Sequence, residues 1–255
     1  MKKIYLYSIL LFISLLILWE MMVKVKNISP LILPTPTTIA ENLFTLLRSG
    51  YFTPHIITTL IEIISGFFVG ALIGIGLGLL VSQSNTLRLV LKPYIIATQA
   101  MPKVALAPLL ILWFGYGYTP KILIVALISF FPLFESTITG LLVVDKDRLA
   151  LFQLLKASKW QTLWRLQLPT AIPSLLSGMR VALVLSVVGA VVSEFIGANK
   201  GLGALIIVAQ GMMDTPLLFS AFILLTTIGI LLYASIYAIE HLFLRKYTTY
   251  RRKNS

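Results

Sequence analysis

The stretch Asp145–Pro173 reads DKDRLALFQLLKASKWQTLWRLQLPTAIP and separates two long apolar runs of the chain. Five lysines and arginines and two aspartates lie in it among leucines, a phenylalanine and two tryptophans. The sequence on either side is apolar enough to lie in a bilayer. A charged, amphipathic insert in such a chain is where a membrane protein would contact something soluble, so this stretch predicts a membrane protein with an exposed loop.

The composition supports a membrane protein. Of the 255 residues, 58% are hydrophobic and 12% are charged, whereas a soluble domain is about half apolar and a quarter charged. A single core of this length cannot hide that much apolar surface, so lipid is the expected solvent. The net charge of +12 is explained by cations on cytoplasmic loops, because no soluble basic module suited to nucleic acid is present.

Several classes of site are excluded by residue usage. The chain has no cysteine and only two histidines, His55 and His241, which are far apart in sequence. This argues against a disulfide framework and against thiolate or histidine metal sites. The chain also lacks the glycine-rich phosphate-binding motifs, and no paired carboxylates or nucleophile–base set indicates an enzyme. We therefore expect a protein without catalytic, metal or cofactor residues.

Six apolar runs predict an all-α membrane protein with six transmembrane helices in one domain spanning 1–255. The runs lie at about 4–23, 56–81, 93–114, 121–144, 170–196 and 216–244. The first is interpreted as a retained span, because Trp19–Met22 offers no small-x-small signal-peptidase site. Between the runs we predict a short surface helix that Thr37 or Thr38 caps and that ends at Arg48. We also predict a polar loop at Gln83–Lys92 and a glycine-rich loop at Gly197–Asp214.

The placement of cations predicts the topology. With a cytoplasmic amino terminus, the inner segments hold most of the lysines and arginines. Since cytoplasmic loops carry this excess, both termini and the loop 145–169 are predicted to be cytoplasmic. Lys121 falls on an outer segment in this arrangement.

Two features of the spans indicate close packing or a pathway. Gly66, Gly70, Gly74 and Gly78 recur on one helical face, which favours close approach of another helix, with a bend or gate as the alternative. Met101–Lys103 interrupts the third span, and Pro102 disfavours a helix just before it. A broken span leaves backbone groups that only protein or water can satisfy, so this is either a pathway element or a plain kink.

Ionisable residues inside spans are functional candidates by default. Glu62, Glu135, Arg180 and Glu194 qualify by position. We expect Glu135 to be buried. Glu62 and Glu194 lie towards the outer ends of their spans, so reaching the outer surface is the alternative to a functional role. Arg180 is expected to pair with Glu135 or to neutralise a passing anion. The candidate translocation pathway consists of Pro102, Pro108, Glu135, Arg180 and Glu194.

The charged insert has helical periodicity. Leu149, Phe152 and Leu155 form one apolar group, and Trp160, Leu163 and Trp164 form another. We predict two short amphipathic helices that join at a bend near Lys156–Lys159 and stop at Leu168–Pro169. The physical pattern alone leaves two partners open, a lipid surface or a docked protein.

The order and spacing of several motifs resemble the inner-membrane permease subunits of bacterial ABC importers, within the branch of nitrate, sulfonate and taurine permeases. The resemblance covers nearly the whole chain. Its motifs are Leu33–Pro36, Pro54–His55 with Thr59–Leu60 and Gly66–Phe67, Met101–Leu109, Trp113–Gly115, Leu168–Pro169 with Pro173, Gly178–Arg180, and Glu194 with Gly201–Gly203.

The resemblance implies partners and a role for the insert. It implies a homodimer of permease subunits in the bacterial cytoplasmic (inner) membrane, with two ATP-binding cassette ATPase subunits docked on the loop. An extracytoplasmic solute-binding protein would deliver the solute, and the ATPase partner would bind ATP. The implied coupling residues are Leu149, Leu151, Phe152, Leu155, Lys156, Ala157, Ser158, Lys159, Trp160, Leu168 and Pro169.

The insert departs from the family pattern in one respect. The family's Glu-Ala-Ala signature falls here on Ala150, Leu151 and Phe152, and the following glycine falls on Lys156. Bulky residues at these positions imply a differently shaped docking groove.

The resemblance favours import of a small anion such as sulfonate, taurine or nitrate. The alternative solutes are a thiamine-pyrimidine precursor or a riboflavin-like molecule. An ATP-independent secondary transporter is the alternative from another class, although the chain shows no persuasive inverted repeat.

Overall fold

In this computed structural model, the backbone of residues 2–253 is described, and so are the side chains other than those of residues 2–5, 92, 96 and 242–253. All regular structure in the described part is helical. The chain forms two compact units. Unit 1 comprises Met1–Thr59 and Ala198–Thr227, and unit 2 comprises Leu60–Gly197 and Ile228–Ser255. The prediction of one domain over 1–255 stays a prediction.

Unit 1 contains α1 (Lys2–Val25), α2 (Pro36–Arg48), α10 (Leu202–Gly211) and the first turns of α3 (Thr53–Ser82) and α11 (Thr215–Lys253). The cap of α2 is Thr35, whose side chain accepts from the Thr38 amide, so the prediction of Thr37 or Thr38 is wrong. Pro36 favours the first position of the helix, where a missing N–H costs nothing. The residue before it, Thr35, is therefore the cap.

The loop predicted at Gly197–Asp214 contains a helix, α10, so that prediction is wrong. The glycines of this segment disfavour a helix and so indicate a loop. Most of the apolar side chains of α10 are buried, however, and this burial stabilises the helix. Its first turn is tied to α3 within unit 1. Thr59 Oγ1 accepts from the Leu202 amide at 2.9 Å, and His55 Nδ1 lies 2.9 Å from the Gly201 carbonyl oxygen.

In unit 2, α3 (Thr53–Ser82) packs against α6 (Tyr118–Leu142) at the predicted glycine face. A Cβ on Gly70 would lie 2.8 Å from the Ala126 carbonyl oxygen, and one on Gly74 would lie 2.7 Å from that of Phe130. Only glycine allows this approach. The prediction of close packing is confirmed.

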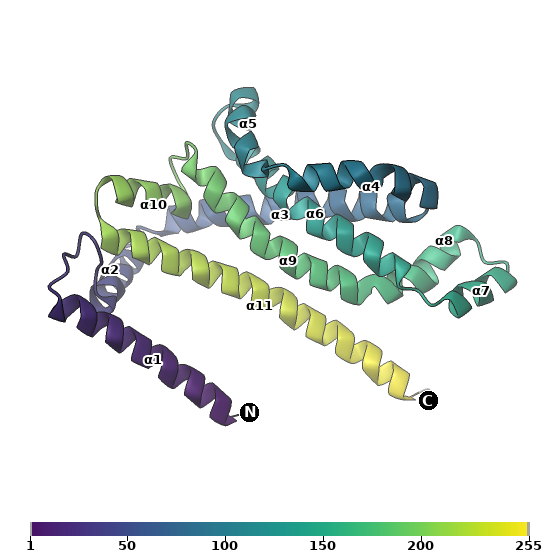
Figure 1. Cartoon of the computed structure of the whole chain (residues 1–255), viewed down its shortest axis with the longest axis horizontal. Helices are drawn as coiled ribbons and strands as arrows, with labels where there is room; N and C mark the ends of the chain where they lie inside the picture. The colour runs from purple at the N-terminus through teal and green to yellow at the C-terminus, as the bar shows by residue number, and fades with distance from the viewer. Residues whose placement is uncertain (1, 254–255) are drawn as a thin grey trace. The chain divides into compact units, whose positions relative to one another are not determined.

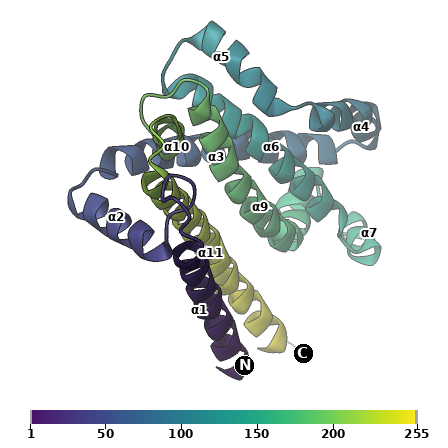
Figure 2. The ribbon, with the colours of Figure 1, turned by 60° about the vertical axis from the view of Figure 1, so that its left-hand side comes forward.

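The helix α9 (Leu168–Phe195) packs along α6 (Figure 1, Figure 2). Gly140 and Gly178 lie at this contact, where a Cβ on Gly178 would lie 3.1 Å from the Pro132 carbonyl oxygen. A buried cluster of Leu141, Leu163 and Ala171 closes one end of the contact.

The third predicted span is broken as expected. It consists of α4 (Asn85–Ala100), η1 (Lys103–Leu106) and α5 (Ala107–Phe114), with a bend of 78° at the break. The predicted loop Gln83–Lys92 is wrong, because Ser84 caps α4 by accepting from the Leu87 amide at 3.2 Å. Pro93 therefore lies inside α4 instead of opening the span.

Among the described residues, five helices are long and apolar enough to cross a membrane, and the bent α4–α5 pair makes a sixth if counted as one span. This agrees with the six-span prediction. The last span belongs to α11 (Thr215–Lys253). Of the strongly basic tail 245–255, residues 254 and 255 lie outside the described part.

The predicted helix stop at Leu168–Pro169 is wrong. The segment α8 (Lys159–Thr162) continues through η2 (Leu163–Gln167) into α9, so that Lys159–Phe195 is one membrane-grade helix. The η2 segment has the wider π-helical turn. Pro169 lacks a backbone donor and lies in the first turn of α9, where the local widening accommodates it.

Candidate functional site

Three adjoining cavities follow the surface of α6 and α9 within unit 2. The first has a volume of about 510 Å³ and lies between α4 and α6. The second, of about 480 Å³, lies between α6 and α9 and shares Phe131, Glu135 and Thr139 with the first. The third, of about 410 Å³, shares Ser177 and Val181 with the second and adds Arg180 and Tyr233. We call these three neighbouring cavities the trough.

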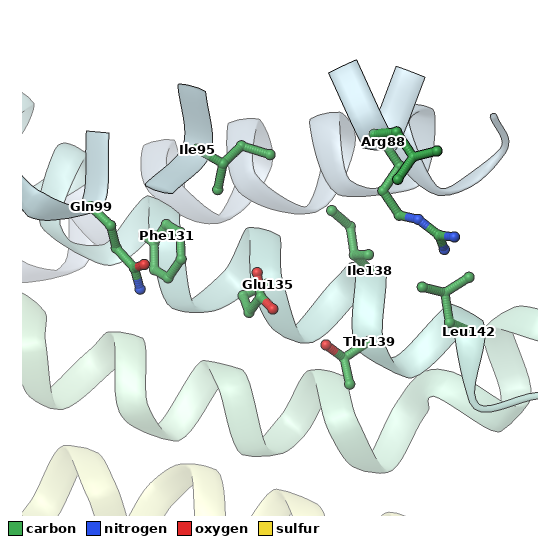
Figure 3. A pocket seen from close by; sticks show the side chains of 9 residues that line it. Arg88, Ile95, Gln99, Phe131, Glu135, Ile138, Thr139 and Leu142 are labelled. Atoms are coloured by element: carbon green, nitrogen blue, oxygen red, sulfur yellow. The ribbon is translucent and has the colours of Figure 1, made fainter. Parts of the chain in front are cut away.

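Glu135 lies where the first two cavities meet. Figure 3 shows it between Gln99 and Phe131 on one side and Arg88 and Leu142 on the other. Its side chain is exposed, so the expectation of burial is wrong, because α4 and α9 leave this face of α6 open. Glu135 is seven residues from the end of α6 at Leu142, or about 10 Å along the helix axis.

An exposed carboxylate at that depth limits what can cover it. Placing a charge against lipid at the centre of a span costs roughly 3 kcal/mol. Such groups therefore face water or protein. The open face of α6 at Glu135 is thus suited to a polar pathway and poorly suited to lipid.

Arg180 is paired, but not with Glu135. Its Nε lies 3.2 Å from Glu240 Oε2, and its Nη2 donates to Glu240 Oε1 at 3.4 Å. This pair joins α9 to α11 within unit 2. Glu240 was missed by sequence reasoning, although a carboxylate inside the last apolar run was a usable signal. The positive charge that lines the third cavity is therefore compensated.

Glu62 and Glu194 are both buried, so the alternative that they reach the surface is wrong. Lys121 Nζ donates to Glu62 Oε1 at 2.7 Å, and the Glu62 carboxyl also interacts with Glu194. Lys121 lies buried in the first turn of α6 and not on an outer loop. Because Lys121 places an ammonium beside the buried Glu62, the carboxyl group is compensated inside the protein and does not need to reach the surface.

The five predicted pathway residues are not all brought together. Glu135 and Arg180 line the trough, whereas Pro102, Pro108 and Glu194 line none of its three cavities. Pro102 lies in the break between α4 and η1, and Pro108 lies in the first turn of α5, both exposed. The structure adds the neutral polar groups Gln99, Thr139, Ser136, Ser174 and Ser177.

The insert forms α7 (Lys146–Leu154) and α8 with a sharp bend between them. Asp145 caps α7 by accepting from the Asp147 amide, and Ser158 and Gln161 form a reciprocal capping box on α8. Lys156 has a φ of +52°. The Lys156 and Ala157 amides donate to the carbonyls of Gln153 and Phe152, the pattern that usually ends in glycine. Lys156 thus adopts the left-handed conformation that the family's glycine favours.

The two helices present an uncovered apolar surface. We call it the loop surface, formed by Leu151, Leu154, Leu155, Trp160 and Trp164, all exposed. The Trp160 and Trp164 rings pack edge to face with centroids 5.4 Å apart. Leu149, Phe152, Ala157, Leu168 and Pro169 are half-buried instead.

A cavity of about 370 Å³ lies between the insert and the end of α3. It is lined by Ser82, Gln83, Leu149, Gln153, Ala157, Lys159, Thr162 and Gln167. Both short helices therefore adjoin a concave, largely polar site beside the loop surface.

Comparison with known proteins identifies the class. Residues 66–249 match the family of binding-protein-dependent transport system inner membrane components. The match spans well over half of the chain and includes α6, α9 and the insert. The chain therefore belongs to this family, the permease subunits of ABC importers, and is a multi-pass protein of the inner membrane.

Individual relatives carry different transport names. The chain is 37% identical over 231 residues to the riboflavin transport permease RibX of Chloroflexus aurantiacus, covering 91% of this chain and 86% of that protein. It is 35% identical over 246 residues to the formylaminopyrimidine transport permease ThiX of Halalkalibacterium halodurans, covering 96% and 98%. It is 32% identical over 231 residues to the taurine transport permease TauC of Escherichia coli, covering 89% and 84%.

The fold also matches a solved importer. The MetNI methionine ABC transporter in an inward-facing conformation aligns with a TM-score of 0.68 at 16% identity, covering 75% of this chain and 95% of that one. This likeness supports the helical permease fold.

Proposed function

We propose that two copies of this chain form the membrane pathway of an ATP-driven importer, and that a separate ATPase subunit docks on the loop surface of each copy. The observation that carries this proposal is the uncovered apolar surface of α7 and α8, which a soluble chain would normally bury. The ATPase partner binds and hydrolyses ATP, and the permease chain holds no cofactor. Both termini and the insert are cytoplasmic in this arrangement, as the cation distribution favours.

The helix connectivity supports a way to couple ATP hydrolysis to the pathway. Because α8, η2 and α9 form one helix from Lys159 to Phe195, a displacement of docked α8 is carried into α9. That helix lines the second and third cavities through Ser177 and Arg180. The π-helical turn at Leu163–Gln167 lies on this path, between docked α8 and α9.

The lining of the trough supports a heterocyclic solute, of the aminopyrimidine or flavin kind, over a small anion. Glu135 faces the junction of the two largest cavities of the trough, and a carboxylate repels sulfonate and nitrate. Arg180, the cation expected to receive an anion, is already paired with Glu240. The relatives named for riboflavin and formylaminopyrimidine support the same class.

A small anion remains the second candidate, because Arg88 lines the first cavity at its far end. Its guanidinium donates to Asn85 Oδ1 at 2.6 Å, and the residue is half-buried. The relative named for taurine belongs with this alternative.

Uptake into liposomes tests the proposal. The full-length chain is reconstituted with its ATPase and with the binding protein, and labelled aminopyrimidine, riboflavin and taurine are offered in turn. We expect uptake that needs ATP inside the liposomes, on the side where the ATPase is docked, and binding protein outside them, and that persists when ion gradients are collapsed. Uptake by the chain alone under an ion gradient would establish a secondary transporter instead.

A further inference from the structure

We propose that Phe131, Glu135 and Gln99 form a recognition site for a planar heterocycle that presents N–H donors, such as an amino-substituted pyrimidine. This inference rests on the proposed importer function and narrows its substrate class to a particular set of side chains in the pathway.

The three side chains converge on one cavity from two helices. Phe131 and Glu135 are one turn apart on α6 and so lie on the same face, and Gln99 approaches from α4. Figure 3 shows the Phe131 ring beside the Gln99 amide, with the Glu135 carboxylate one turn further along. An aromatic ring, a carboxylate and an amide therefore border the same volume.

The chemistry of these groups selects the ligand. An aromatic face stacks on a planar ring, and an ionised carboxylate only accepts hydrogen bonds, most strongly from N–H donors. A glutamine amide both donates and accepts, which matches the alternating N and N–H edge of an aminopyrimidine. Lys103 Nζ lies over the Phe131 ring, 5.9 Å from its centroid, so the opposite face is the one left for stacking.

The charge at the site points to a donor on the ligand. Among the described side chains, the ion pairs of unit 2 are those of Lys121 with Glu62 and of Arg180 with Glu240, so Glu135 is in neither. The other charged group of the same cavity, Arg88, lies beyond Ile138 at its far end. Lys103 lies against the Phe131 ring, but it forms no ion pair with Glu135 among the described side chains. A carboxylate without an ion-pair partner is matched by N–H groups or a cationic ring, and not by a sulfonate without N–H groups.

The size also fits. Ligand sites usually enclose about 300–1,000 Å³, and the first cavity offers about 510 Å³. Glu135 also lines the neighbouring second cavity of about 480 Å³. A ring recognised at Glu135 therefore stands at the passage from α4 to α9, where a moving solute would cross.

Ligand binding to the permease–ATPase complex in lipid nanodiscs, without binding protein, tests this site. The probes are an aminopyrimidine, its N,N-dimethyl analogue, which lacks the donors, and ethanesulfonate, an anion without N–H groups. The wild type should prefer the amino compound over the dimethyl compound by about ten-fold. Glu135→Gln should reduce that preference to about two-fold, whereas Phe131→Leu should weaken both compounds equally. Glu41→Gln and Phe44→Leu, exposed positions on α2, are the matched controls and should change neither.

Several outcomes overturn the inference. One is an unchanged preference in Glu135→Gln, since a merely structural carboxylate would alter both affinities alike. Others are absence of aminopyrimidine binding by the wild type, or tighter binding of ethanesulfonate that Glu135→Gln improves. ATP turnover of the same complexes separates the two claims. If ATP turnover responds to solute but the complex does not prefer the amino compound over the dimethyl compound, only the proposed recognition site is contradicted. If the ATPase neither associates with the chain nor changes its turnover, the importer function itself is contradicted.

Discussion

Lys121 and Glu62 join the first turn of α6 to α3 through a hydrogen bond of 2.7 Å between Nζ and Oε1. The Glu62 side chain is 0% exposed, and Glu194 adds a second acid to the same place. One ammonium therefore compensates a buried pair of carboxyls contributed by α3 and α9.

Removing the ammonium alone should be costly. Lys121→Met leaves the buried Glu62 without its partner, so we expect the free energy of unfolding to fall by about 3–5 kcal/mol. Lys121→Met combined with Glu62→Gln should recover most of the loss, because the amide is neutral and can donate to Glu194. Thermal unfolding in one detergent measures both variants. If Lys121→Met alone were as stable as the wild type, the Lys121–Glu62 pair would contribute nothing to the free energy of unfolding.

The glycine face of α3 offers an internal comparison. Gly70→Ala forces a Cβ to within 2.8 Å of the Ala126 carbonyl oxygen, and overpacking of this kind should lower stability by about 1–3 kcal/mol. Gly76→Ala, on the same helix, meets nothing within 4 Å and should be neutral or slightly stabilising. Equal melting temperatures for the two variants would contradict the close packing of α3 on α6.

The Arg180–Glu240 pair predicts a change in both stability and selectivity. Glu240→Gln should cost about 1.5–3 kcal/mol, the value of a hydrogen bond to a charged group. It also frees Arg180 to face the third cavity, so binding of taurine should increase relative to wild type. The exchanged variant, Arg180→Glu with Glu240→Arg, should restore stability. If taurine binding does not respond to Glu240→Gln, Arg180 does not face the solute.

Much of the fold could be predicted because an apolar run long enough to cross a bilayer as a helix is a strong signal of a membrane span. The break at Pro102 was predictable for a local reason, the missing donor of proline. The short helix α10 was missed because its ten residues are too few for a span and glycines surround it. The continuity of α8 with α9 was missed because the π-helical turn that accommodates Pro169 leaves no sequence signal.

The site was less accessible from sequence. Glu62, Glu135, Arg180 and Glu194 were recognised as candidates from the sequence, but their partners Lys121 and Glu240 were not. Arg180 meets Glu240 and Lys121 meets Glu62 across about sixty positions of sequence, and such register depends on helix packing. The exposure of Glu135 likewise depends on α4 and α9 diverging from that face of α6.

The bend at Lys156 allows a test of the comparison between this lysine and the glycine that the family has at the same position. A non-glycine residue in the left-handed region is strained by roughly 1–2 kcal/mol, and Lys156 has a φ of +52°. Lys156→Gly should therefore leave the loop geometry intact and raise stability slightly. Lys156→Val should lower stability, because a β-branched residue tolerates this conformation poorly. Melting temperatures in the reverse order would mean that the bend does not need this conformation.

The most direct test of the central claim is ATP turnover of the reconstituted importer, stimulated by solute-loaded binding protein, with and without a disrupted loop surface. Leu154 and Trp160 are 81% and 67% exposed, so Leu154→Glu with Trp160→Glu should leave the chain folded while placing carboxylates in an apolar contact. Ile32→Glu, equally exposed and outside the family-matched residues 66–249, is the control. We predict that the double variant loses ATPase association and stimulated turnover while Ile32→Glu retains both; full stimulated turnover in the double variant would contradict the assignment of α7 and α8 as the ATPase dock.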